Sequence, residues 1–165
     1  MLELFEHNQK AYQAAVRMME KYGKAAIVHP TGTGKSYIAF HLIEEHAEEV
    51  IFWLSPSEYI FRTQLENLKK QASDLPLQNV HFYTYAKLMC CAPEELAAIA
   101  ALSPAYIILD EFHRVGAECW GASTMGLLKC CPNAKMLGLS ATNVRYRITS
   151  ATWHRSCSMG MLRRK

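Results

Sequence analysis

Hydrophobic and polar positions follow two different periods along this chain. Five short runs are nearly continuous in apolar residues and end at turn-forming residues, which predicts buried β-strands over residues 24–29, 50–54, 79–85, 105–110 and 134–140. Between them, apolar residues recur at intervals of three and four, which predicts helices over residues 7–23, 35–49, 55–71, 93–102 and 117–130. Because apolar strands alternate with helices, we expect an α/β fold with a doubly wound parallel sheet, covered by helices on both faces.

Local signals mark two of the predicted helix ends. Gly23 follows the last apolar position of the first helix and is typical of a helix C-terminus. Ser55 and Glu58 have the spacing of a capping box, and Pro56 falls at the first helical position, where proline is well tolerated. The third helix is therefore predicted to begin directly after Ser55.

Length and composition indicate one globular domain. The chain has 165 residues, of which 50% are hydrophobic and 20% are charged. No apolar run approaches the roughly 18–20 residues of a membrane span. The start, MLELFEHNQKAY, lacks the basic and apolar regions of a signal peptide. We therefore expect a cytoplasmic domain without a membrane partner.

Charge is distributed unevenly along the chain. Its net charge is +3, but residues 145–165 contain six of the 18 Lys and Arg residues and none of the 15 Asp and Glu residues. The main body is therefore slightly acidic, which argues against a strongly basic nucleic-acid-binding surface. A basic tail of this kind can bind phosphates non-specifically, or it can be an accidental, irregular end.

The six cysteines include two adjacent pairs and show no C-x₂-C spacing. Because adjacent cysteines do not comfortably ligate one tetrahedral ion, the pattern indicates reduced, largely buried thiols rather than a zinc site.

A glycine-rich turn follows the first predicted strand and leads into a helix. It reads His-Pro-Thr-Gly-Thr-Gly-Lys-Ser over residues 29–36. Its glycines allow several backbone N–H groups to point at one anion, and the helix N-terminus adds partial positive charge. Lys35 is predicted to reach the β- and γ-phosphates of a nucleotide, and the Ser36 hydroxyl to ligate Mg²⁺. The common pattern has glycine where His29 stands. The predicted nucleotide-binding residues of this loop are Thr31, Gly32, Thr33, Gly34, Lys35 and Ser36.

Two carboxylates end the most apolar strand. Asp110 and Glu111 lie directly after Tyr106–Leu109, where adjacent buried charges are costly unless a cation meets them. We expect Asp110 to hold Mg²⁺ and Glu111 to orient and deprotonate an attacking water. Together with the glycine-rich loop, this pair indicates nucleotide hydrolysis.

The segments Asp-Glu-Phe-His (110–113) and Gly-Leu-Ser-Ala-Thr (138–142) resemble motifs II and III of superfamily 2 helicases and translocases. The match is closest to the DEAD/DEAH-box group with the restriction-enzyme-type helicase domain. Further stretches agree in order with the adenine-reading segment, motif Ia, motif Ib and the continuation of motif III: Tyr12–Ala15, Trp53–Pro56 followed by Gln64, Phe82–Leu88, and Thr142–Arg145.

The resemblance implies a RecA-like lobe of the P-loop NTPase type that uses ATP and Mg²⁺. It implies catalytic roles for Glu111, Lys35 and His113, the last also linking the nucleotide site to motif III. It implies that Ser140 and Thr142 couple the nucleotide state to nucleic acid and that Gln13 recognises adenine. It also implies contact with a nucleic-acid backbone for four residues: Ser55, Pro56, Arg62 and Thr84. Gln9 is an alternative to Gln13, and Arg62 is equally well explained as a solvated charge on a helix face.

The resemblance further implies partners. These are nucleic acid, with DNA favoured over RNA, and a second RecA-like lobe that this chain does not contain. Without that lobe, we expect weak ATP binding, slow hydrolysis and no unwinding. Two other interpretations stay open, namely a P-loop ATPase with another purpose, such as packaging or remodelling, and a truncated, non-catalytic nucleotide-binding module.

The last part of the chain differs in character from the rest. We predict a helicase ATP-binding domain over residues 1–146 and an irregular basic tail over residues 147–165, which has no clear period. The second Ser-Ala-Thr, at residues 150–152, has no strand before it and is interpreted as coincidence. One permitted set of codons for residues 147–160, read one nucleotide out of phase, encodes an acidic amphipathic helix, so a frameshift that shortened a longer helicase gene is one hypothesis.

Overall fold

The computed structural model describes residues 2–71, 77–113, 118–141 and 161–162. Helices and strands alternate along them, as the apolar pattern predicts. The helices are α1 (Glu6–Tyr22), α2 (Lys35–Glu45), α3 (Glu58–Gln71), α4 (Tyr85–Cys90), α5 (Pro93–Ala100) and α6 (Glu118–Cys130). The strands are β1 (Lys24–Val28), β2 (Ile51–Ser55), β3 (Val80–Thr84), β4 (Tyr106–Asp110), β5 (Lys135–Ser140) and β6 (Met161–Leu162).

The strands form one parallel sheet in the order β3-β2-β4-β5-β1-β6. Val28 pairs with Ser140, and Leu139 pairs with Asp110, so β1, β5 and β4 end at the same edge. On β2 and β3, Ser55 pairs with Thr84 at that edge too. The parallel register therefore gathers the loops after β1, β2, β3, β4 and β5 at one edge of the sheet.

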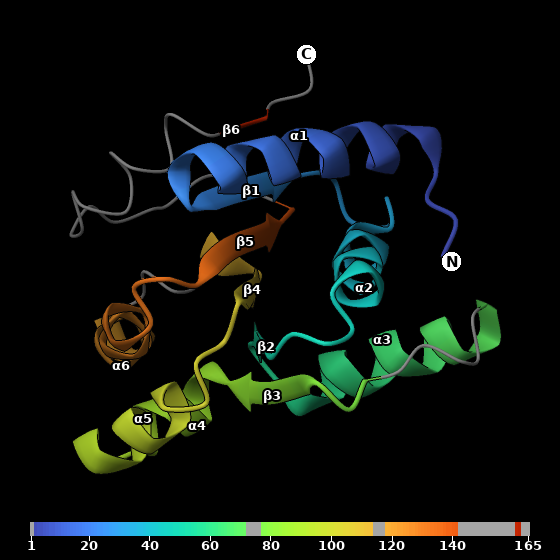
Figure 1. Ribbon diagram of the computed structural model, residues 1–165. Coiled ribbons are helices and arrows are strands. Elements are labelled where there is room, and N and C mark those ends of the chain that lie inside the picture. The colour runs from blue at the N-terminus through green and yellow to red at the C-terminus, as the bar shows by residue number, and fades with distance from the viewer. Residues whose placement is uncertain (1, 72–76, 114–117, 142–160, 163–165) are drawn as a thin grey trace.

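Helices cover both faces of this sheet, with α1, α2 and α3 on one side and α4, α5 and α6 on the other (Figure 1). Successive residues of β2 face opposite sides of the sheet. Ile51 and Trp53 pack into the core beneath the first group of helices, while Phe52 and Leu54 pack into the core beneath the second. All four side chains are fully buried, so the near-continuous apolar runs are explained by burial on both faces. The doubly wound α/β fold is confirmed.

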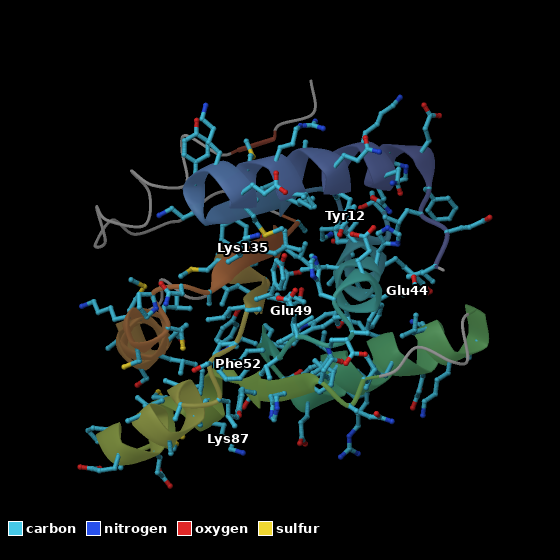
Figure 2. The ribbon with its side chains drawn as sticks, in the orientation of Figure 1. Tyr12, Glu44, Glu49, Phe52, Lys87 and Lys135 are labelled. Atoms are coloured by element: carbon cyan, nitrogen blue, oxygen red, sulfur yellow. The ribbon has the colours of Figure 1, made fainter. Side chains whose placement is uncertain are left out.

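Helix α1 packs on the sheet through one stripe of residues. Ala11, Ala15 and Met19 recur at intervals of four and are buried. Tyr12 lies on the same stripe and points from α1 towards α2, where its hydroxyl donates to the Glu45 carboxylate (Figure 2). Gly23 ends the helix, and its N–H donates to the Met19 carbonyl over 2.8 Å, as the sequence predicts.

The predicted start of the third helix is wrong. Ser55 is the last residue of β2 and pairs with Thr84, and α3 begins only at Glu58. The side chain of Ser57, rather than that of Ser55, accepts from the backbone N–H of Ile60 over 3.3 Å. The physical reason is that Pro56 disfavours a helical conformation of the residue before it, so Ser55 stays extended.

Two further differences concern short segments. Helix α2 ends at Glu45 instead of residue 49, where His46 turns the chain. Helix α4 has no counterpart in the sequence-based expectations, because six residues are too few for a helical period. Its start is set by Thr84, whose hydroxyl accepts from the Lys87 backbone N–H over 3.1 Å. Among the described helices, none is long and apolar enough to cross a membrane.

Candidate active site

The loop between β1 and α2 is held in the shape of an anion-binding turn. Gly32 and Gly34 have φ angles of 81° and 79°, which side-chain-bearing residues rarely adopt. His29 continues the β1–β5 ladder by donating its backbone N–H to the Ser140 carbonyl over 3.1 Å. The Thr33 hydroxyl closes the turn by donating to the Pro30 carbonyl over 2.8 Å. The loop therefore presents the N-terminus of α2 at the edge where β1, β4 and β5 end.

The start of α1 fastens this loop from outside. The Asn8 side-chain amide donates to the carbonyls of Thr33, over 2.8 Å, and Gly34, over 3.3 Å. A His7 ring nitrogen lies 3.1 Å from the same Thr33 carbonyl. Asn8 is fully buried, and its amide nitrogen lies 3.0 Å from where a Cβ on Gly34 would be. A side chain at residue 34 would therefore collide with this clamp.

Lys35 is the cation of the pocket. Its ammonium group donates to the carbonyls of His29 and Pro30 over 2.8 and 2.9 Å. Burial lowers the pKa of Lys35, while the carboxylates of Glu111 and Asp110 oppose that shift. The positive charge of Lys35 therefore lies at the loop carbonyls and is close enough to the Glu111 and Asp110 carboxylates to interact with them.

Asp110 is the buried acid of the pocket, with 5% of its surface exposed. Burial, with a smaller contribution from the nearby charge of Glu111, raises the pKa of this carboxyl to about 6. A hydrogen bond from the Gln64 amide, over 3.2 Å, and the charge of Lys35 act in the opposite direction. A carboxylate in such surroundings favours a cation as its partner.

Glu111, His113 and Ser140 form a second group that spans two strand ends. The His113 Nδ1 atom lies 2.7 Å from the Ser140 hydroxyl and 3.1 Å from Glu111 Oε2. The Ser140 hydroxyl lies 3.4 Å from the same carboxylate oxygen. Glu111 has a φ of 49°, a strained conformation that persists only where neighbours hold it. The three side chains therefore place the end of β5 in direct contact with the acid that follows β4.

Two buried aromatic residues support this strained turn. The Tyr85 hydroxyl donates to the backbone carbonyl of Asp110 over 2.7 Å, and Tyr85 is fully buried. Phe112 packs directly over Gly138, where an added Cβ would lie 2.9 Å from the ring. The turn is thus pinned from both sides, which fixes where Glu111 points.

A cavity of about 300 Å³ joins these elements. Seven of its lining residues are predicted from the sequence: Thr31, Gly32, Gly34, Lys35, Ser36, Asp110 and Glu111. The other five were not assigned to a nucleotide site: Tyr37, Phe40, Ile60, Gln64 and Asn67. Thr33 is not among its lining residues; its carbonyl accepts from Asn8 instead. Gln13 is exposed on α1, whereas Gln9, beside Asn8, is half-buried.

This donor set fits a polyphosphate with a divalent cation. Loop amides, the α2 N-terminus and Lys35 are groups that can bind an anion, while the Ser36 hydroxyl and the Asp110 carboxylate offer oxygen ligands of the kind that Mg²⁺ prefers. Among the described residues, no cluster of three or more His, Cys, Asp or Glu side chains forms an all-protein metal cage. Mg²⁺ held partly by phosphates needs only one or two protein ligands.

Two of the residues predicted to contact nucleic acid, Ser55 and Thr84, end strands at the same edge of the sheet. Ser55 is buried at the end of β2, and Pro56 follows it, half-buried. Thr84 ends β3 and caps α4. Arg62 is exposed on α3, 3.9 Å from Glu58. Thr142 and the predicted tail, residues 147–165 apart from Met161 and Leu162, lie outside the described residues.

Sequence reasoning missed several residues of the site. Asn8 occupies the apolar stripe of α1 together with Ala11, Tyr12 and Ala15, and a polar residue in such a stripe is a usable signal. Gln64 was grouped with motif Ia, and only the packing of α3 brings it to Asp110. Tyr85 lies in the stretch that resembles motif Ib, but its contact with the Asp110 carbonyl is long-range and leaves no local pattern.

Comparisons with known proteins agree with this geometry. Residues 1–145 match the family model described as "Type III restriction enzyme, res subunit". No curated protein matches the chain. Three solved structures share the fold at low sequence identity, and the residues of this chain cover only part of each.

The SWI2/SNF2 ATPase core of Sulfolobus solfataricus in complex with dsDNA matches with a TM-score of 0.58 and 16% identity, over 85% of this chain and 32% of that one. The Hef helicase domain of Pyrococcus furiosus matches with a TM-score of 0.57 and 17% identity, over 84% of this chain and 33% of that one. A hypothetical ATP-dependent RNA helicase from Sulfolobus tokodaii matches with a TM-score of 0.56 and 17% identity, over 79% of this chain and 45% of that one.

These likenesses confirm the RecA-like fold of helicase cores, and this chain spans about a third of the first two of them. The resemblance to superfamily 2 helicases is confirmed by the family match, which covers most of the chain. The chain belongs to the family of type III restriction enzyme res subunits.

Proposed function

We propose that this lobe binds and hydrolyses ATP with Mg²⁺ and, paired with a second RecA-like lobe, uses that hydrolysis to move on nucleic acid. The observation that carries this proposal is the meeting of Lys35, Ser36, Asp110 and Glu111 around one cavity at the end of the sheet.

Each of these groups has a distinct task in the proposed reaction. Lys35 leaves the loop carbonyls to neutralise the β- and γ-phosphate oxygens, and the loop amides orient the phosphate chain. Ser36 and Asp110 hold Mg²⁺, which when bound shields the phosphate charge. Glu111 accepts the proton of the attacking water, and the strained turn keeps its carboxylate in place. His113 and Ser140 hold that carboxylate and relay its position to the segment after β5.

DNA is the proposed nucleic acid. The support is the match to the SWI2/SNF2 ATPase core, which is bound to dsDNA in that structure, together with the family match. Ser55, Pro56, Arg62 and Thr84 remain the proposed contacts with the nucleic-acid backbone. Ser55 and Thr84 end strands at the edge of the sheet where the nucleotide pocket forms, and Arg62 is exposed on α3, whose inner side lines that pocket. Thr142 remains the proposed partner of Ser140 in coupling.

For the base, we propose that α1 supplies the adenine-reading glutamine. Gln9 is the better candidate of the two, because it follows Asn8 at the phosphate loop and is half-buried, whereas Gln13 is exposed. Replacing each by alanine and comparing the affinities for ATP and GTP separates them. Loss of the preference for ATP only in the Gln13 variant would favour Gln13 instead.

The proposed function is tested with two variants of different expected behaviour. Lys35→Ala is expected to lose nucleotide binding, because it removes the cation of the pocket. Glu111→Gln is expected to retain binding of ATP·Mg²⁺ but to lose turnover, because the base is gone. Lys129→Ala, on the exposed side of α6, is the matched control. ATP binding and hydrolysis unaffected by Lys35→Ala would refute the proposal.

A further inference from the structure

Gln64 brings α3 into direct contact with the acid at the end of β4. Its side-chain nitrogen donates to Asp110 Oδ2 over 3.2 Å, across 46 positions of sequence. Together with Ile60 and Asn67, it forms the α3 side of the cavity, facing the loop residues Lys35 and Ser36. A surface helix thus supplies a polar group to the centre of the pocket.

The other end of the same amide is unused. Gln64 Oε1 is buried and accepts no hydrogen bond from the described residues. Leaving a buried carbonyl oxygen without a donor is unfavourable, so such an atom in a cavity calls for a ligand that donates. A carboxylate can only accept, and so Asp110 fixes which end of the amide faces it and leaves the oxygen for another group.

The chemistry of Mg²⁺ identifies that group. This ion dehydrates reluctantly and keeps several water molecules when one or two carboxylates and phosphates hold it. Each bound water is a strong donor, and outer groups that accept from it or orient a ligand tune the affinity for the metal. The Gln64 side chain can do both, because its nitrogen orients the Asp110 carboxylate and its oxygen can accept from a metal-bound water.

We propose that Gln64 is a positioning residue of the magnesium site. Its N–H₂ group holds the Asp110 carboxylate, and its carbonyl oxygen accepts from a water molecule bound to Mg²⁺. This inference rests on the proposed function. It assigns Gln64 to the metal rather than to the nucleic-acid backbone.

The position of Gln64 on α3 agrees with this assignment. Arg62, two residues earlier and thus on the opposite side of the helix, is exposed. Helix α3 therefore carries a solvent-facing side available to a nucleic acid and an inner side that touches Asp110. A shift of α3 would therefore move both its solvent-facing side and the side that touches Asp110.

The experiment measures the affinity of the 165-residue chain for a fluorescent ATP analogue, once with Mg²⁺ and once with EDTA. Gln64→Leu removes both polar atoms, and Gln64→Asn keeps the amide on a side chain one methylene shorter. Glu66→Gln is the matched control, because Glu66 is exposed on the same helix and does not line the cavity. Thermal melting shows that each variant is folded, and if Gln64→Leu is not folded, Gln64→Asn decides.

We expect both Gln64 variants to lose about tenfold or more of the affinity that Mg²⁺ adds, with unchanged affinity in EDTA. The control is expected to keep the full gain. Equal losses with Mg²⁺ and with EDTA, or no loss at all, would overturn the proposal for Gln64. A wild-type chain that binds no nucleotide under either condition would instead overturn the proposed function itself.

Discussion

At the scale of single residues, Asp110 makes stability depend on pH. Its pKa is about 6 in the folded chain, against an ordinary value of 3.8, because burial disfavours the charged form. Between these two values the folded state retains a proton that the unfolded state has released. The contribution of Asp110 to stability therefore falls as pH rises from about 4 to about 6. Above pH 6 its buried carboxylate costs about 3 kcal/mol.

This cost predicts that Asp110→Asn stabilises the protein in a pH-dependent way. In EDTA, the variant is expected to unfold at higher urea concentration than the wild type at pH 8, and to show a markedly smaller difference at pH 4.5. Glu94→Gln, at an exposed position of α5, provides the control and should change neither value. An Asp110→Asn effect of the same size at both pH values would contradict the assignment.

Gly138 sets the contact between β5 and the turn after β4. Because an added Cβ would lie 2.9 Å from Phe112, we expect Gly138→Ala to destabilise the fold by about 1–3 kcal/mol. The same change at Gly126 has room, with Leu96 4.0 Å away, and should stabilise α6 by up to about 1 kcal/mol. Urea denaturation of the two variants compares them directly. Gly138→Ala with wild-type stability would show that Phe112 moves freely.

At the scale of elements, the start of α1 acts as a clamp on the phosphate loop. Asn8→Leu removes both hydrogen bonds to the carbonyls of Thr33 and Gly34. We expect a loss on the order of 1–3 kcal/mol in unfolding free energy, and weaker nucleotide binding, because two hydrogen bonds that tie the phosphate loop to α1 are lost. Arg17→Ala, exposed on the same helix, should alter neither property. Calorimetry and nucleotide titration check this, and unchanged values for Asn8→Leu would exclude the clamp.

Elements also show how far the sequence alone predicts this molecule. Strands such as Ile51–Ser55 were predictable, because burial on both faces leaves a continuous apolar run. The loop at Gly32 and Gly34 was predictable as well, because its chemistry is local. The start of α3, helix α4 and the contact between Gln64 and Asp110 were not. The start of α3 was misplaced because Pro56 keeps Ser55 extended, and α4 is too short to show a helical period. The contact between Gln64 and Asp110 depends on packing between segments 46 positions apart in sequence, which no local pattern records.

At the scale of the whole molecule, the cavity forms at one edge of the sheet, and under the proposed function this lobe would supply only one wall around a nucleotide. The loop amides, Lys35, Asp110 and Glu111 all come from the ends of β1 and β4. In the helicase cores that share the fold, this chain corresponds to about a third of the length. A second lobe that closes over the γ-phosphate and contributes an arginine raises the rate on the order of 10³–10⁵-fold where such groups act.

This arrangement predicts that a chain of these 165 residues alone binds ATP·Mg²⁺, hydrolyses it slowly and unwinds no duplex. Lys35 and the loop suffice to hold phosphate, but nothing among the described residues of this lobe reaches across the open side of the cavity to stabilise the transition state. Single-turnover hydrolysis and a strand-displacement assay test the two statements separately, with Lys35→Ala as the background. Robust unwinding that disappears in Lys35→Ala would show that one lobe is enough. Slow hydrolysis that rises when a second RecA-like lobe is joined to the chain, and rises further with DNA, is the result we expect, because closure and backbone contact each complete a part of the site that β1, β4 and β5 leave open.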